Sequence, residues 1–231
     1  MLPYYSMFQE EDKLSNLFTA SPAVSYSKKE IILHSFAEYE SLFIVKDGVV
    51  RSFYTDEKGV ELTVNLLKPR AIFPLSGYLT GKENLYDFEA FTDVTLHKAP
   101  KEKVKEIIFK SAEFSSYYLE KFSQALEGYV VRSRFLANGN ATQKITSALL
   151  MLSRRFGKEA EEKTIINLPL THQDIADLAG VTRETVSILI GLLRKEGIIS
   201  TRAKYLTILN SDKLLLKASE NDDGSLMNLS F

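Results

Sequence analysis

The sequence contains no cysteine among its 231 residues. Disulfide bonds, thiolate iron–sulfur clusters, cysteine zinc sites and a cysteine nucleophile are therefore excluded. Histidine is scarce as well. The three histidines, His34, His97 and His172, stand far apart and form no H-x-H pair. We therefore expect no bound metal and no cofactor in this protein.

Long apolar runs are missing too, since no segment approaches the roughly 18 residues that a membrane-spanning helix requires. The N-terminal stretch MLPYYSMFQEEDKLSN is acidic and lacks the basic-then-apolar order of a secretory signal. We therefore expect a cytoplasmic protein with no membrane partner. Residues 139–209 hold 10 Lys and Arg against 7 Asp and Glu. This excess of positive charge is too small to demand or to exclude a nucleic-acid partner.

Short β-rich runs separated by turn signals fill residues 24–99. Lys46-Asp47-Gly48 and Asp56–Gly59 each follow an apolar run, and Asp-Gly sequences favour tight hairpin turns. The pattern predicts an antiparallel sandwich or barrel-like roll with a hairpin at each of these two positions.

Helical periodicity begins at Pro100 and predicts a short helix over 101–109 and a long helix over 112–137. An apolar stripe recurs along the long helix at spacings near 3.5 residues. Such a stripe packs either within its own domain or against a partner helix, and its length and aromatic character favour a dimer interface. Its members are Phe114, Tyr118, Phe122, Ala125, Tyr129 and Leu136.

Residues 170–199, LTHQDIADLAGVTRETVSILIGLLRKEGII, predict two short amphipathic helices around a tight corner. Thr171 suits the N-cap of the first helix, and Asp174 completes a capping box. Gly180 supplies the left-handed residue that the corner requires, and Thr182 caps the second helix.

The exposed face of the second helix begins with polar side chains, Arg183 and Glu184 among them. A helix of this kind can lie in a DNA major groove with its first residues against base edges. A predicted β-hairpin carrying Arg202 and Lys204 follows, which is the layout of a winged helix-turn-helix. The competing interpretation of the pair is an ordinary helical corner in an enzyme.

The stretch LTHQDIADLAGVTRETVSILIGLLRKEGIIS resembles the helix-turn-helix of the Crp/Fnr family of bacterial transcription regulators. The FIVKDGVVR segment, the long helix and the following ANGNAT boundary at 137–142 agree with that family. The resemblance implies an α+β homodimer that reads pseudo-palindromic double-stranded DNA and contacts RNA polymerase. Four parts are expected: a β-roll effector domain over 1–110, a dimerisation helix and hinge over 111–138, a winged helix-turn-helix over 139–210 and a tail over 211–231.

The resemblance also implies roles for individual residues. Arg183 would donate to guanine and Glu184 would accept from cytosine. Ile188 stands where many family members carry arginine, so we expect a changed preference at one base pair. The implied base contacts are Arg183, Glu184, Ser187 and Ile188, and the implied phosphate contacts are Thr171, Gln173, Thr182, Thr185, Arg202 and Lys204.

The roll lacks the residues with which the cyclic-nucleotide branch of the family holds its ligand. Phe73–Ser76 stands in place of the Gly-Glu pair, and Asn84–Tyr86 in place of the arginine. A buried cyclic phosphate without an arginine would be an unpaired charge, so we expect no tight binding of cyclic AMP. The expected effector pocket comprises Phe73, Leu75, Ser76, Tyr86 and Arg132.

The segments FPLSGYLTG and AFTDVTLHKAP resemble the cyanobacterial nitrogen-control regulators, which implies 2-oxoglutarate as effector. The arginine that those proteins use in the roll has no counterpart here, and Pro74 lacks an N–H group that could hold a carboxylate. The sequence also leaves open haem at His34 or His97, control by abundance, an adaptor without DNA binding, and a cupin-like enzyme.

Overall fold

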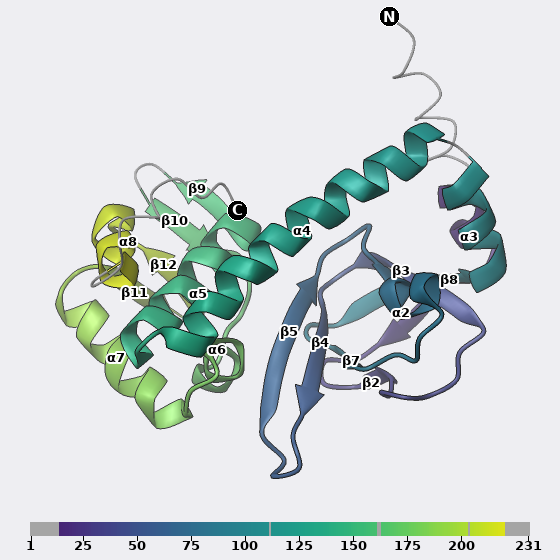
Figure 1. The fold of residues 1–231 in the computed structure, drawn as a ribbon. Coiled ribbons are helices and arrows are strands. Elements are labelled where there is room, and N and C mark those ends of the chain that lie inside the picture. The colour runs from purple at the N-terminus through teal and green to yellow at the C-terminus, as the bar shows by residue number, and fades with distance from the viewer. Residues whose placement is uncertain (1–13, 111, 161–162, 203, 220–231) are drawn as a thin grey trace, which may run out of the picture. The chain divides into compact units, whose positions relative to one another are not determined.

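The computed structural model of the protein describes residues 14–110, 112–160, 163–202 and 204–219 (Figure 1). The chain divides into two compact units, Met1–Phe122 and Ser123–Phe231. This division falls inside α4 (Ala112–Asn138), so the second half of the long helix belongs to the C-terminal unit. None of the described helices is both long enough and apolar enough to cross a membrane.

The first unit is built on two four-stranded antiparallel sheets, which confirms the predicted roll. Strand order is β1-β8-β3-β6 in one sheet and β2-β7-β4-β5 in the other. Apolar side chains from both sheets form a shared core that includes Val45, Val50, Phe88 and Leu96. The strands are β1 (Val24–Tyr26), β2 (Ile31–Leu33), β3 (Ser41–Asp47), β4 (Val50–Thr55), β5 (Glu61–Leu67), β6 (Ile72–Phe73), β7 (Asp87–Ala90) and β8 (Val94–Pro100).

Of the two predicted hairpins, one is confirmed and one is wrong. At Asp56–Gly59 the chain turns from β4 into β5, and Gly59 has a φ of 78°. The turn at Gly48 instead carries the chain from one sheet to the other, since β3 pairs with β6 and β8 while β4 pairs with β5 and β7. Gly48 serves close packing, because a Cβ there would lie 2.2 Å from the carbonyl oxygen of Asp93.

Helices pack against strands of the first unit and add a second apolar cluster to its core. The predicted helix over 101–109 is confirmed as α3 (Lys101–Lys110), which buries Val104 and Ile108. Both side chains share a second apolar cluster with Leu14 and Phe18 of the helical residues 14–19. A short helix, α2 (Leu75–Thr80), follows β6 directly.

In its described residues, the second unit contains four helices in addition to its share of α4, together with a four-stranded antiparallel sheet of order β11-β12-β10-β9. The predicted wing is confirmed, because β11 and β12 form a hairpin directly after the helix pair. The elements are α5 (Ala141–Phe156), β9 (Gly157–Ala160), β10 (Lys163–Ile166), α6 (His172–Ala179), α7 (Arg183–Lys195), β11 (Ile199–Arg202), β12 (Tyr205–Ile208) and α8 (Ser211–Ser219).

The helix α8 lies in the segment 211–231 that the sequence analysis described only as a tail. The side chain of Asn210 accepts a hydrogen bond from the backbone N–H of Lys213, at 2.9 Å, and so caps the helix. Leu214 and Ala218 are fully buried, and Ala218 packs against Phe135 of α4. These contacts make α8 an integral part of the second unit, although residues 220–231 lie outside the described part of the chain.

Candidate nucleic-acid interface

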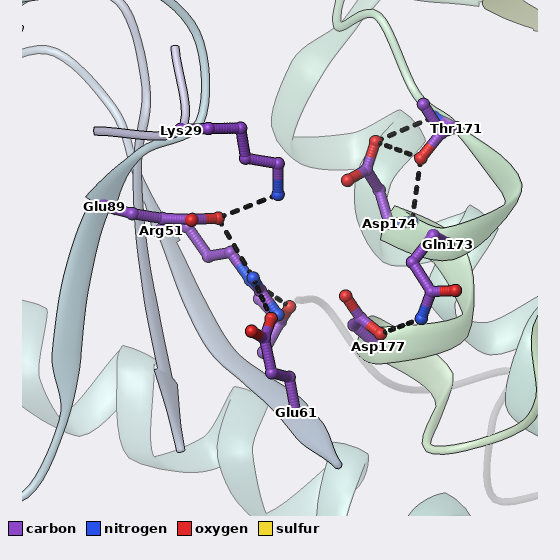
Figure 2. A network of polar contacts seen from close by, with 9 residues as sticks. Lys29, Arg51, Glu61, Glu89, Thr171, Gln173, Asp174 and Asp177 are labelled. Carbon is purple, nitrogen blue, oxygen red and sulfur yellow. Dashed lines mark hydrogen bonds and ion pairs between the residues drawn. The ribbon is translucent and has the colours of Figure 1, made fainter. Parts of the chain in front are cut away.

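The corner between α6 and α7 has the capping geometry that the sequence predicted. The Thr171 hydroxyl accepts from the Asp174 backbone N–H at 3.1 Å, and the Asp174 carboxylate accepts from the Thr171 backbone N–H at 2.8 Å (Figure 2). Gly180 ends α6 in the left-handed conformation, with a φ of 62°. At the start of α7, the Thr182 hydroxyl accepts from the Thr185 backbone N–H at 3.3 Å. Gly180 and the Thr182 cap therefore define the corner, and the Thr171–Asp174 capping box defines the start of α6.

Packing determines which side of α7 points outward. Val186, Ile190 and Leu193 recur at helical spacing and are buried. The four predicted base contacts, Arg183, Glu184, Ser187 and Ile188, are all exposed, and Ile188 is 67% exposed.

The side chains of Arg183 and Glu184 have no hydrogen-bond or ion-pair partner among the residues that the structure describes. A guanidinium and a carboxylate at the first turn of a capped helix are thereby left available to a ligand outside the chain.

Most of the predicted phosphate contacts lie on exposed surface around α7. Thr171, Gln173 and Thr182 are exposed and Thr185 is half-buried. The Gln173 amide donates from Nε2 to Oδ1 of Asp177 at 2.6 Å, and Asp177 is itself 7% exposed (Figure 2). This buried carboxylate holds the side chain of Gln173 in one orientation at the start of α6.

The wing is attached to the start of the helix pair through the backbone. Leu170 donates its N–H to the carbonyl oxygen of Lys204 at 2.9 Å, and Lys204 has a φ of 70° in the turn after β11. The side chains of Arg202 and Lys204 are exposed. The second unit therefore presents two cations at the tip of its wing.

The structure places Arg132, an expected effector-pocket residue, in the second unit. Its guanidinium donates from Nη2 to the carbonyl oxygen of Leu178 in α6, at 2.9 Å. Burial, together with the nearby positive charge of Arg155, lowers the pKa of Arg132 to about 10. Arg132 thus fastens the second half of α4 to the first helix of the pair.

The other expected effector residues belong to the first unit, and Phe73 among them is a core side chain. It is 2% exposed, and its ring stacks against Phe43 and Phe88 at centroid distances of 5.4 and 4.8 Å. Leu75 and Tyr86 are half-buried and Ser76 is exposed. The Phe73–Ser76 segment, which we expect in place of the Gly-Glu pair, therefore begins with a side chain of the protein's own core.

Asn84 begins the Asn84–Tyr86 segment that we expect in place of the phosphate-binding arginine. Its side chain is buried, and its Nδ2 donates to the carbonyl oxygens of Tyr86 at 2.6 Å and His34 at 3.3 Å. A neutral amide whose donors serve the protein's own backbone offers no charge to a cyclic phosphate.

Arg51 is a buried arginine of the roll that the sequence analysis did not single out. It is 1% exposed, and its Nη1 donates to Glu61 at 2.6 Å and to Glu89 at 3.0 Å (Figure 2). Burial lowers its pKa, but the hydrogen bonds and charges of Glu89 and Glu61 outweigh burial, so the pKa is raised overall. Arg51 thus forms structural ion pairs with two carboxylates of the protein, so its charge is not available to bind an anionic ligand. The sequence did contain a signal for this ion pair, because Arg51 stands among the apolar residues of a predicted strand.

The long helix α4 carries an exposed apolar face. Among its described residues, large apolar side chains that are more than half exposed occur at spacings of three or four: Leu119 (67%), Phe122 (61%), Leu126 (54%) and Val130 (61%). Of the predicted stripe, Phe122, Ala125 and Tyr129 are exposed and Leu136 is half-buried. Tyr118 packs against the second cluster of the first unit. The helix carries Phe114, but the placement of that side chain is outside the described structure.

Comparison with known proteins supplies the family. Residues 143–216 match a Crp-like helix-turn-helix domain, and residues 23–111 match a cyclic nucleotide-binding domain. A global nitrogen regulator of Nostoc sp. (strain PCC 7120 / SAG 25.82 / UTEX 2576) is 32% identical over 212 residues, which cover 87% of this chain and 95% of that protein. The chain belongs to the Crp/Fnr family of transcription regulators.

Solved structures agree with the Crp/Fnr assignment. A transcriptional regulator of this family from Thermus thermophilus is 29% identical, with a TM-score of 0.68 over 86% of this chain and 98% of that one. FixK2 from Bradyrhizobium japonicum, at 22% identity, shares the fold with a TM-score of 0.74 over 88% of this chain and 98% of that one. The predicted family and the α+β fold class are therefore confirmed, and a Crp/Fnr protein is a DNA-binding regulator and not an enzyme.

Proposed function

We propose that the protein is a homodimeric regulator that reads a pseudo-palindromic DNA site through α7. The observation that carries this proposal is the exposed, unpaired start of α7, where Arg183 and Glu184 project beside Ser187 and Ile188. When a helix-turn-helix binds DNA, the first residues of its second helix lie in the major groove and contact base edges. Arginine then donates to guanine and glutamate accepts from cytosine.

The proposed phosphate contacts lie at the starts of α6 and α7 and on the wing. Thr171 and Thr182 lie at the N-termini of α6 and α7, where backbone N–H groups and the helix dipole favour an anion. Gln173 is held by Asp177, and the wing adds Arg202 and Lys204. Contacts of this kind fix the register of a protein on the duplex without reading its sequence.

The homodimer is supported by the exposed face of α4. Leu119, Phe122, Leu126 and Val130 follow the spacing of a two-helix seam, and side chains of this size are rarely left in water in such a row. Two copies of α4 packed along this face would present two α7 helices to one DNA duplex. Contact with RNA polymerase, which the family resemblance implies, is part of the same proposal.

The control of the regulator is proposed to involve a small-molecule effector other than cyclic AMP. The segment expected in place of the Gly-Glu pair begins with the core side chain of Phe73, and the segment expected in place of the arginine begins with the neutral amide of Asn84. The aromatic stack through Phe73 favours a second interpretation, in which the roll binds no ligand and the regulator is controlled by its abundance. Titration calorimetry with cyclic AMP tests both interpretations. Both predict no tight binding of that nucleotide, so micromolar binding would contradict them.

Substitution Arg183→Ala tests DNA reading by α7. Each good bidentate contact to guanine is worth about 1–3 kcal/mol, and a symmetric dimer makes the contact twice. The Kd for a site selected with the wild-type protein should therefore rise at least about 30-fold, measured by fluorescence anisotropy at fixed salt. Lys213→Ala is the matched control, because it removes one exposed charge from α8 and should leave specific binding within about threefold. An unchanged Kd for Arg183→Ala would contradict the proposal.

A further inference from the structure

A glycine interrupts the third turn of α7. Gly191 lies well inside Arg183–Lys195, and glycine is a poorer helix former than every residue except proline. A Cβ built at this position would meet no heavy atom within 4 Å. Nothing in the described structure therefore requires a glycine here, and alanine would make a more stable helix.

Gly191 belongs to the outward side of α7. It is exposed, and it follows Ser187 by four residues and Ile188 by three, so it lies one turn beyond them on the same face. The inward side is occupied by Val186, Ile190 and Leu193. Gly191 thus leaves a gap without a side chain in this face, between the exposed Ile188 and the exposed Arg194.

The distance from Arg183 to Gly191 along the helix indicates which part of a bound DNA duplex would lie next to Gly191. Gly191 follows Arg183 by eight residues, which is about 12 Å at a rise of 1.5 Å per residue. The major groove of B-form DNA is about 12 Å wide. If Arg183 contacts base edges, Gly191 lies where the helix meets the sugar–phosphate wall of the groove.

We infer that Gly191 lets the DNA backbone approach the main chain of α7 to van der Waals distance. The inference rests on the proposed function, and it makes Gly191 a positioning residue whose missing side chain sets the depth of α7 in the groove. Any side chain at 191 would hold the helix away from the duplex and lengthen the contacts of Arg183 and Glu184. The helix accepts a poor helix former at this position because DNA occupies the space.

The chain offers a matched control for helix propensity. Gly128 also lies inside a long helix, α4, and a Cβ there would likewise meet nothing within 4 Å. It falls outside the spacing of the exposed apolar residues Leu119, Phe122, Leu126 and Val130. Gly128→Ala should therefore stabilise a helix without touching either DNA or the dimer face.

The test compares Gly191→Ala, Gly191→Leu and Gly128→Ala in the full chain. Differential scanning calorimetry should show a higher Tm for Gly191→Ala and Gly128→Ala than for the wild type. Fluorescence anisotropy on the DNA site selected with the wild-type protein should show a Kd about tenfold higher for Gly191→Ala and higher still for Gly191→Leu. The Kd of Gly128→Ala should stay within twofold of wild type.

Two outcomes would overturn the inference. One is DNA binding within twofold of wild type for both Gly191 variants, which would show that nothing approaches this position. The other is a lower Tm for Gly191→Ala, which would show that α7 needs the glycine for its own fold. Failure of the proposed function looks different, because Arg183→Ala would then also bind like the wild type.

Discussion

Truncation of Leu126 tests the exposed face of α4 as a dimer interface. Leu126 is 54% exposed in the single chain. Burial of a whole leucine side chain contributes about 1.5–3 kcal/mol, so covering the exposed half contributes about 0.8–1.5 kcal/mol. A symmetric interface buries the residue twice, and Leu126→Ala should therefore cost the dimer about 1.6–3 kcal/mol. Since 1.4 kcal/mol corresponds to a factor of ten, the dimer Kd should rise roughly 15- to 150-fold.

Sedimentation equilibrium at several protein concentrations measures this change directly. Leu216→Ala is the matched control, because Leu216 is 56% exposed on a helix but lies on α8. Its truncation should leave the dimer Kd within about twofold of wild type. Equal and small effects of the two substitutions would refute the assignment of the interface to this face of α4, as would a wild-type protein that stays monomeric at micromolar concentration.

Three further predictions concern particular side chains. Arg51→Met should lower the free energy of unfolding by about 3–5 kcal/mol in urea, because the buried Glu89 then keeps only the half-exposed Lys29 as a partner, and a loss below about 1 kcal/mol would contradict this. If Asp177 acts on DNA binding through Gln173, Asp177→Ala should weaken binding in the wild type but not in Gln173→Ala, whereas additive losses would show independent roles. Ile188→Arg should shift the preference at one base pair by about 1–3 kcal/mol in parallel site selections, and identical motifs would sink that assignment.

The parts of the structure that local chemistry determines were predictable from the sequence. Thr171, Gly180 and Thr182 mark the ends of α6 and α7 because capping involves only neighbouring residues. The outward side of α7 followed from the period of its apolar residues. The exposure of Arg183 could therefore be predicted from the sequence alone.

Features that depend on residues far apart in the chain were not predictable in the same way. The turn at Gly48 reads locally as a hairpin, yet sheet pairing is decided by strands that lie far along the chain. Arg51 and Glu89 are adjacent only because β4 and β7 pair in one register. The helix α8 was missed for another reason, since its cap and its Leu214–Ala218 pair are short signals in a polar segment.

Binding-site selection with the full chain is the most direct measurement of the central claim, that two α7 helices from a symmetric dimer read one duplex. The account predicts recovery of an inverted repeat whose half-site centres lie about 34 Å apart, which is one turn of B-form DNA. Quantitative footprinting should show both half-sites protected at the same protein concentration. Recovery of a single half-site, of a direct repeat or of no enriched motif would contradict it.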